Sequence, residues 1–76
     1  MSRIEVQLVS PPDRENLAIH LMVDHEQLAE VNQESDTLAV EIYGRRDGQP
    51  WVIEFDELAI ALKNAKERLA GTSAAE

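Results

Sequence analysis

The chain has 76 residues, no cysteine and a formal net charge of −8, from 15 acidic and 7 basic residues. A chain of this length holds one small hydrophobic core, and without cysteine it has neither disulfides nor thiolate metal ligands. The negative charge disfavours nucleic acid and anionic membranes as partners, and no apolar run approaches the ~20 residues that span a bilayer, so we expect a cytoplasmic protein that binds neither.

The first predicted elements are two strands. Residues 4–9 alternate apolar and polar side chains with period 2, which is typical of a half-buried strand, and Pro11 and Pro12 end it. Residues 17–23 resume the alternation, but here both faces are fairly apolar, which predicts a central position in the sheet. The letters DHEQ at 24–27 indicate a tight connection to the next element.

Two more strands are predicted over residues 28–44. Residues 28–33 form the weaker of them, an edge-like strand that places Leu28 on the same side as Glu30. Residues 37–44 alternate most clearly of all. Acidic side chains on an edge strand discourage aggregation between sheets, which is one structural reason for the acids in this region.

A hairpin and a fifth strand are predicted next. The pair Asp47–Gly48 is a strong hairpin signal because glycine tolerates the positive φ of such turns. Residues 51–55 then place three apolar side chains in phase, beginning with Trp51. We expect this tryptophan in the core or at its rim, with a platform for a ligand as the alternative.

The period then changes to that of an amphipathic helix, with Asp56 as its predicted N-cap and Gly71 as its stop. We therefore expect one domain over residues 1–71 and a frayed tail over 72–76. The apolar stripe of the helix consists of Leu58, Ala61, Leu62, Ala65 and Leu69.

These elements predict an α+β fold: an antiparallel meander of four or five strands, followed by one C-terminal amphipathic helix packed on one sheet face. One helix is ~10 Å wide, too narrow to shield five strands spaced ~4.8 Å apart. A partly uncovered apolar surface is therefore expected, and it is available to a second copy or to a partner. With the strands phased as above, the uncovered face would carry Ala18, Met22, Ala39, Tyr43 and Val52.

The residues offer little chemistry. His20 and His25 lie close to Asp24 and Glu26, but the two histidines fall on opposite faces of a straight strand, and no third ligand has a recognisable spacing. The same region lacks the glycine and the acid spacing of a calcium loop. No serine lies in a nucleophile elbow, and the three glycines form no phosphate loop. We expect neither an enzyme nor a bound metal or cofactor.

The most distinctive segment is VDHEQLAEVNQESD at 23–36, which lies within a stretch without lysine or arginine between Arg14 and Arg45. It can be the solvated side of a strand, a metal cradle or a surface for a basic partner. Acidic side chains along this stretch would contact a basic protein partner, and neighbouring aromatic side chains would anchor it. The candidate partner-binding residues are Asp24, Glu26, Glu30, Glu34, Asp36, Glu41, Tyr43 and Trp51.

A resemblance accompanies this pattern. The letters RENL at 14–17, then LAEVNQE, LAVEIYGRRDGQPW and ELAIALKNAKERL, are similar to a group of small bacterial proteins, many of which look like the immunity proteins of polymorphic or contact-dependent toxins. The similarity covers residues 14–69. It implies no catalytic residues. It implies that such a domain binds and blocks another protein, often a basic nuclease toxin.

Three hypotheses follow. The first is a non-catalytic acidic protein-binding module, possibly an immunity-like inhibitor of a basic toxin, in which charge complementarity raises the association rate. The second is a structural homodimer whose sheets pack face to face, with no separate ligand. The third, a small enzyme or metal protein, would require metal retained through Asp24, His25 or Glu26.

Overall fold

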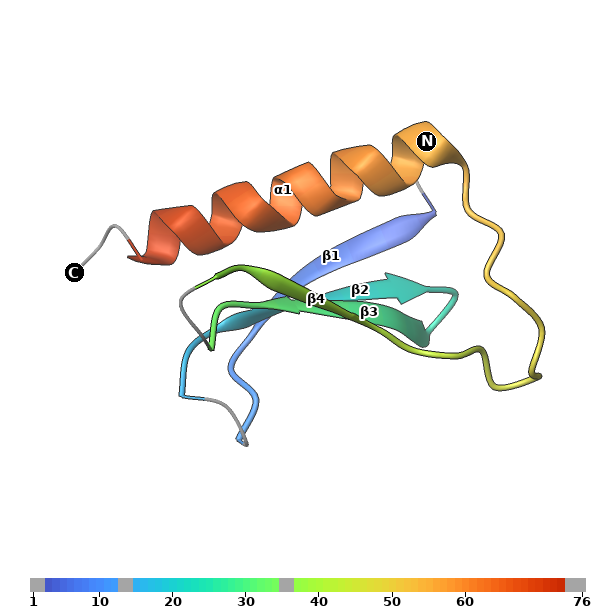
Figure 1. Ribbon diagram of the computed structural model, residues 1–76, viewed down its shortest axis with the longest axis horizontal. Coiled ribbons are helices and arrows are strands. Elements are labelled where there is room, and N and C mark those ends of the chain that lie inside the picture. Colours follow the sequence, from blue (N-terminus) through green and yellow to red (C-terminus); the bar gives the residue numbers. More distant parts are fainter. Residues whose placement is uncertain (1–2, 13–14, 35–36, 74–76) are drawn as a thin grey trace.

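The computed structural model describes residues 3–12, 15–34 and 37–73. Within these ranges the chain forms an antiparallel meander in the order β1-β2-β3-β4, and α1 then crosses one face of the sheet (Figure 1). The predicted α+β fold with one C-terminal helix packed on the sheet is confirmed. The elements are β1 (Ile4–Val9), β2 (Ala18–Val23), β3 (Glu26–Asn32), β4 (Ala39–Ile42) and α1 (Phe55–Ser73).

β1 and β2 form the half of the sheet that lies beneath α1. Val6 lies opposite Leu21 and Ile4 opposite Val23, so apolar side chains of both strands share the face toward the helix. β2 pairs with β1 on one side and β3 on the other, which confirms its predicted central position.

A two-residue turn joins β2 to β3. Asp24 has φ of 51° and His25 has φ of 66°, so both central residues lie in the left-handed region. Positive φ at both positions characterises the type I′ turn, whose twist matches that of the flanking strands. The predicted tight connection is therefore a hairpin turn, built here without glycine.

β3 corrects the prediction of an edge strand. It pairs with both β2 and β4, and its last five residues are buried. Its polar residues, Glu30 and Asn32, led to the edge interpretation. They are tolerated inside the sheet because hydrogen-bonding side chains on the neighbouring strands satisfy them.

A β-bulge corrects the predicted phase of β3. Ala29 lies opposite Leu21 but Gln27 lies opposite Met22, so Leu28 is the extra residue. The bulge lets Leu28 and Ala29 both line the space beneath α1. Leu28 therefore belongs to the core and does not share the face of Glu30.

The fifth predicted strand is absent from the described residues. The amide of Gly48, at φ of 77°, donates to the carbonyl of Arg45 at 3.1 Å, so Asp47–Gly48 forms a turn, but no strand pairs back onto β4. Residues 51–54 are unpaired chain that leads into α1. Their alternation reflects burial on one side, because the side chains of Trp51 and Ile53 pack against the core.

α1 begins one residue before the predicted N-cap. The amide of Leu58 donates to the carbonyl of Glu54 at 3.1 Å, the first bond of the helical type, so Asp56 lies inside the first turn. There its charge favours the positive end of the helix dipole. The predicted stop at Gly71 is also wrong, because α1 continues to Ser73.

The inner stripe of α1 closes the core. Ala61, Ala65 and Leu69 are buried against the sheet. Small side chains at two of these positions let the helix approach the strands closely. The amide of Arg3 donates to Glu57 Oε2 at 2.6 Å and so ties the start of β1 to the start of α1. No helix in the described residues has both the length and the apolar character needed to cross a bilayer.

Candidate functional site

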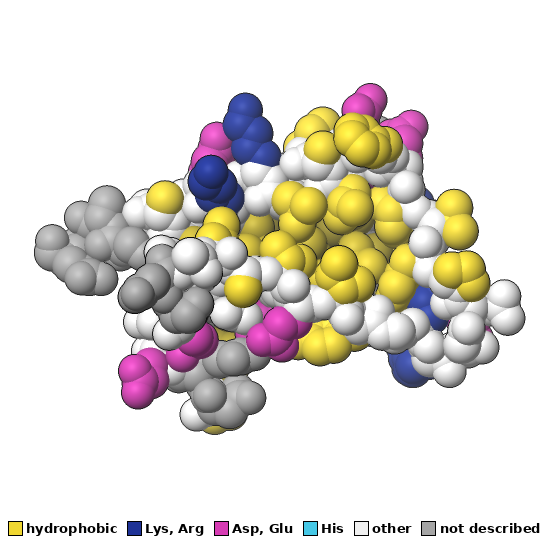
Figure 2. All heavy atoms as spheres, in the orientation of Figure 1, with side chains coloured by type: hydrophobic (Ala, Val, Ile, Leu, Met, Phe, Trp, Pro, Cys, Tyr) yellow, Lys and Arg dark blue, Asp and Glu magenta, His cyan; other side chains and the backbone are white. Residues whose placement is uncertain are grey.

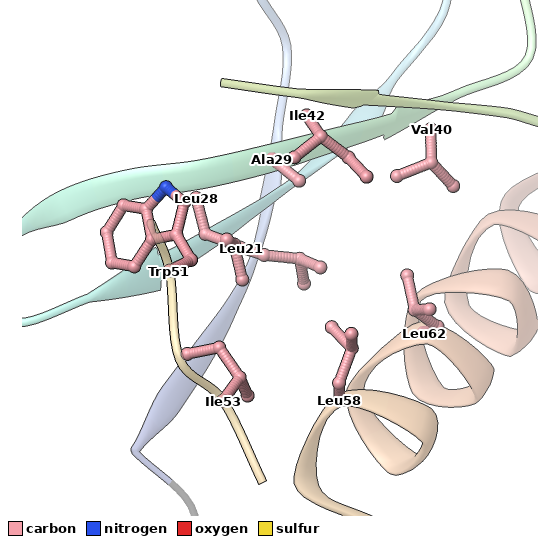
Figure 3. A pocket seen from close by; sticks show the side chains of 9 residues that line it. All are labelled: Leu21, Leu28, Ala29, Val40, Ile42, Trp51, Ile53, Leu58 and Leu62. Carbon is pink, nitrogen blue, oxygen red and sulfur yellow. The ribbon is translucent and has the colours of Figure 1, made fainter. Parts of the chain in front are cut away.

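An apolar groove of about 220 Å³ lies between α1 and the β4 half of the sheet (Figure 3). Its floor comes from the sheet, one wall from the helix and one end from the segment before the helix. Every side chain that lines it is apolar. These residues are Leu21, Leu28, Ala29, Val40, Ile42, Trp51, Ile53, Leu58 and Leu62.

The groove exists because α1 lies toward one side of the sheet. The helix packs on β1, β2 and β3 but does not reach β4. An uncovered surface was predicted from the width of a single helix. Of the residues predicted on it, Ala39 and Tyr43 are exposed, whereas Ala18 is buried and Val52 is not on a strand. The prediction did not include Val40 and Ile42 of β4, which are exposed on the same side as the helix.

The rim of the groove carries large apolar side chains in water. Among the lining residues, the exposed fraction is 74% for Ile42 and 44% for Val40, and Val52, which lies between two lining residues in the chain, is 77% exposed. Figure 2 shows hydrophobic side chains gathered in a hollow beneath the helix, with charged side chains outside it. Single exposed apolar residues are common on proteins, whereas a contiguous patch marks a contact surface.

Trp51 is fixed at the end of the groove by polar contacts on its outer side. Its Nε1–H donates to the carbonyl of Tyr43 at 2.9 Å. The guanidinium carbon of Arg45 lies 5.5 Å from the centre of the indole ring, and Arg45 Nη2 donates to Asp47 Oδ2 at 2.9 Å. These contacts tie the turn, the tryptophan and the end of β4 together, so the groove is largely preformed.

The opposite face of the sheet, here called the helix-free face, carries a polar network. His20 Nε2 lies 3.2 Å from Glu30 Oε1, and Asn32 Nδ2 donates to Glu30 Oε2 at 3.1 Å and to Glu41 Oε2 at 3.2 Å. The hydroxyl of Tyr43 donates to Glu41 Oε1 at 3.2 Å. Glu30 is only 5% exposed. Two of the predicted partner-binding acids therefore have structural partners within the sheet.

The other predicted acids are dispersed. Asp24 Oδ2 lies 3.5 Å from Arg3 Nη2 at the turn, and Glu26 Oε2 accepts the amide of Arg46 at 2.5 Å. The carboxylate of Glu34 accepts two main-chain amides of the β1–β2 connection, both at 3.0 Å. Asp36 lies outside the described residues.

Of the eight predicted site residues, Trp51 lines the groove, and Tyr43 holds it through a main-chain carbonyl. The prediction missed Val40, Ile42 and Leu58, which appeared in the sequence only as ordinary strand and helix positions. The strong apolar alternation at 37–44 was the available signal, because a strand with apolar residues on one face needs something to cover it.

The groove provides binding surface but no reactive group. None of its lining side chains is titratable or nucleophilic. Elsewhere in the described chain, no three side chains of histidine, cysteine, aspartate or glutamate are grouped so that they could hold a metal ion. No family model, no curated protein and no solved structure matches this chain.

Proposed function

We propose that this protein is a non-catalytic protein-binding module, and that the groove between α1 and β4 is its contact surface. The observation that carries the proposal is the exposed apolar rim around an entirely apolar lining. Covering such a surface is favourable by about 25 cal/mol for each Å² removed from water.

The size of the groove favours a protein partner over a small ligand. Pockets for small molecules usually measure about 300–1,000 Å³ and contain a few polar groups that orient the ligand. This groove is smaller, at about 220 Å³, and has no polar lining side chain. A row of apolar side chains from a strand or helix suits it better, because main-chain or rim contacts then provide the orientation.

Immunity-like inhibition of a basic toxin in the cytoplasm is a narrower form of this proposal. The net charge of −8 supports it, because a cationic partner would be attracted at long range. The carboxylates of Glu30, Glu34 and Glu41 are less suited to direct contact, since each accepts hydrogen bonds within the chain. In this form of the proposal, charge accelerates encounter and the groove supplies the contact.

A site-specific spin label tests the proposal. The chain has no cysteine, so Val52→Cys places one label on the exposed position between two residues that line the groove, Trp51 and Ile53. Ile60→Cys is a matched control, because Ile60 is 65% exposed on the side of α1 that does not line the groove. Label mobility is measured after addition of unlabelled chain, and separately after addition of a protein extract from the source organism.

The proposal predicts slowed motion at position 52 but not at position 60 in at least one of the two additions. Equal responses at both positions, or no response at either, would contradict it. A response to the extract alone identifies a foreign partner, whereas a response to the unlabelled chain identifies self-association.

A further inference from the structure

We propose that the partner of the groove is a second copy of this chain, which pairs its β4 antiparallel to β4 along the free edge of the sheet. This inference rests on the proposed function of the groove. It differs from face-to-face packing of two sheets, because the polar helix-free face stays in water and the two sheets join into one.

The two edges of the sheet differ in the contacts that their outward main-chain groups make. At the β1 edge, Arg68 Nη1 of the helix donates to the carbonyl of Val6 at 3.3 Å, so a side chain of α1 occupies an outward main-chain acceptor. At the β4 edge, no described strand pairs beyond β4. An unprotected edge next to an apolar groove is a template for another strand.

The hydrogen-bond pattern shows which groups β4 offers. The amide of Tyr43 donates to the carbonyl of Leu28 at 3.0 Å, and Ile42 lies opposite Ala29. Ile42 and Val40 are therefore non-hydrogen-bonded positions toward β3, and their amides and carbonyls point away from it. The same two residues expose their side chains beside the groove, so one added strand meets both the main chain and the apolar surface.

A second copy is self-complementary here. A two-fold axis at Val40 places this residue opposite its own equivalent, Ile42 opposite Leu38, and Glu41 opposite Ala39. Apolar side chains then meet on the helix side, and each carboxylate faces a small side chain. An axis at Glu41 would instead place two carboxylates directly opposite each other, which is destabilising. Of these two registers, the charge pattern favours the one centred on Val40.

Disulfide cross-linking tests the pairing and its register. Val40→Cys, Glu41→Cys and Ile60→Cys each give a single thiol, because the chain has none. In the proposed register the Cα atoms at position 40 lie about 5.5 Å apart, within reach of a disulfide, whereas position 41 is offset by two residues from its equivalent and lies beyond about 7 Å. We expect covalent dimers at position 40 at least about tenfold faster than at positions 41 and 60. Equal rates at positions 40 and 60 would overturn the pairing, and fastest cross-linking at position 41 would overturn the register.

Sedimentation tests the same interface without a cross-link. Ile42→Lys places a charge on the paired edge and should weaken dimerisation at least about tenfold, whereas Ile60→Lys should leave it unchanged. Both side chains are mostly exposed in the monomer, so neither variant removes core packing. Two chains of charge −8 repel each other, so the dimer should tighten as salt rises, whereas a complex with a basic partner should weaken.

The outcomes separate this inference from the proposed function. A wild-type chain that stays monomeric up to millimolar concentration overturns the dimer. If the label at position 52 still responds to the extract, the groove remains a binding site for a foreign protein. A dimer that Ile42→Lys does not weaken also overturns the inference, because the copies would then associate through another surface.

Discussion

The indole N–H of Trp51 donates a hydrogen bond to the main-chain carbonyl of Tyr43, with 2.9 Å between nitrogen and oxygen. This bond joins the segment before α1 to the end of β4, although no strand ladder connects them. It fixes the distance between the edge strand and the helix, and therefore the width of the groove.

Replacement of Trp51 by phenylalanine should lower the free energy of unfolding by about 1 kcal/mol, because the ring stays in the groove while the hydrogen bond is lost. Urea unfolding followed by far-ultraviolet circular dichroism measures the change, since the variant has no tryptophan fluorescence. Tyr43→Phe keeps the main-chain carbonyl and serves as the control for the side-chain hydroxyl. A Trp51→Phe variant as stable as the wild type would show that packing alone fixes the segment.

Glu30 on the helix-free face should be the most sensitive of the candidate acids. Its carboxylate is buried and contacts His20 and Asn32, so Glu30→Ala leaves both partners with an unsatisfied group beside a small cavity. We expect a loss of about 2 kcal/mol in the free energy of unfolding. Glu30→Gln retains the shape and one acceptor oxygen, so it should lose less.

The exposed Glu5 on β1 provides a comparison for this prediction. Glu5→Ala should change the free energy of unfolding by less than about 0.5 kcal/mol, as is usual for surface positions. If the two alanine variants were equally stable, the network around Glu30 would not contribute to folding, and this acid would be free to serve a partner.

The turn at Asp24 and His25 should be improved by glycine. His25 has φ of 66°, in the left-handed region of backbone conformation. This conformation is unfavourable for residues with a side chain but almost without cost for glycine. His25→Gly should therefore raise the free energy of unfolding by about 0.5–1 kcal/mol, even though it adds no contact. Thermal or urea unfolding measures it. A destabilised variant would mean that the imidazole makes a contact worth more than the strain it causes.

The sequence predicted most of the fold because short-range patterns dominate it. Period-2 alternation identified β1, β2 and β4, and the change to helical period identified α1. β3 was placed at an edge because its polar residues resemble solvated ones. Only the pairing of the strands shows that Glu30 and Asn32 are satisfied inside the sheet, because their partners His20 and Glu41 lie on the neighbouring strands β2 and β4.

The candidate site was harder to predict for a physical reason. Alternation at 51–55 reports which side chains are buried, but a strand and an unpaired segment packed on one side give the same pattern. Likewise, the apolar stripe on α1 predicts that the helix packs on the sheet, but it does not indicate which strands the helix covers. The groove depends on that lateral position, so the sequence predicted an uncovered surface opposite the helix but not the groove on the helix side of β4.

Two glycines test how far local conformation, rather than contacts, decides stability. A Cβ atom added at Gly71 or at Gly48 would meet no atom within 4 Å, so an alanine fits at both sites without a clash. Gly71 lies within α1, where alanine is the better helix former, and Gly71→Ala should raise the free energy of unfolding by about 0.5 kcal/mol near the helix end. Gly48 has φ of 77°, which strains any side chain, so Gly48→Ala should lower it by about 1 kcal/mol. The same substitution therefore changes the free energy of unfolding in opposite directions at the two positions, and urea unfolding of both variants measures the difference.

If Gly71→Ala were destabilising, residue 71 would end the helix in solution, as the sequence predicted, and the last turn of α1 would not form there.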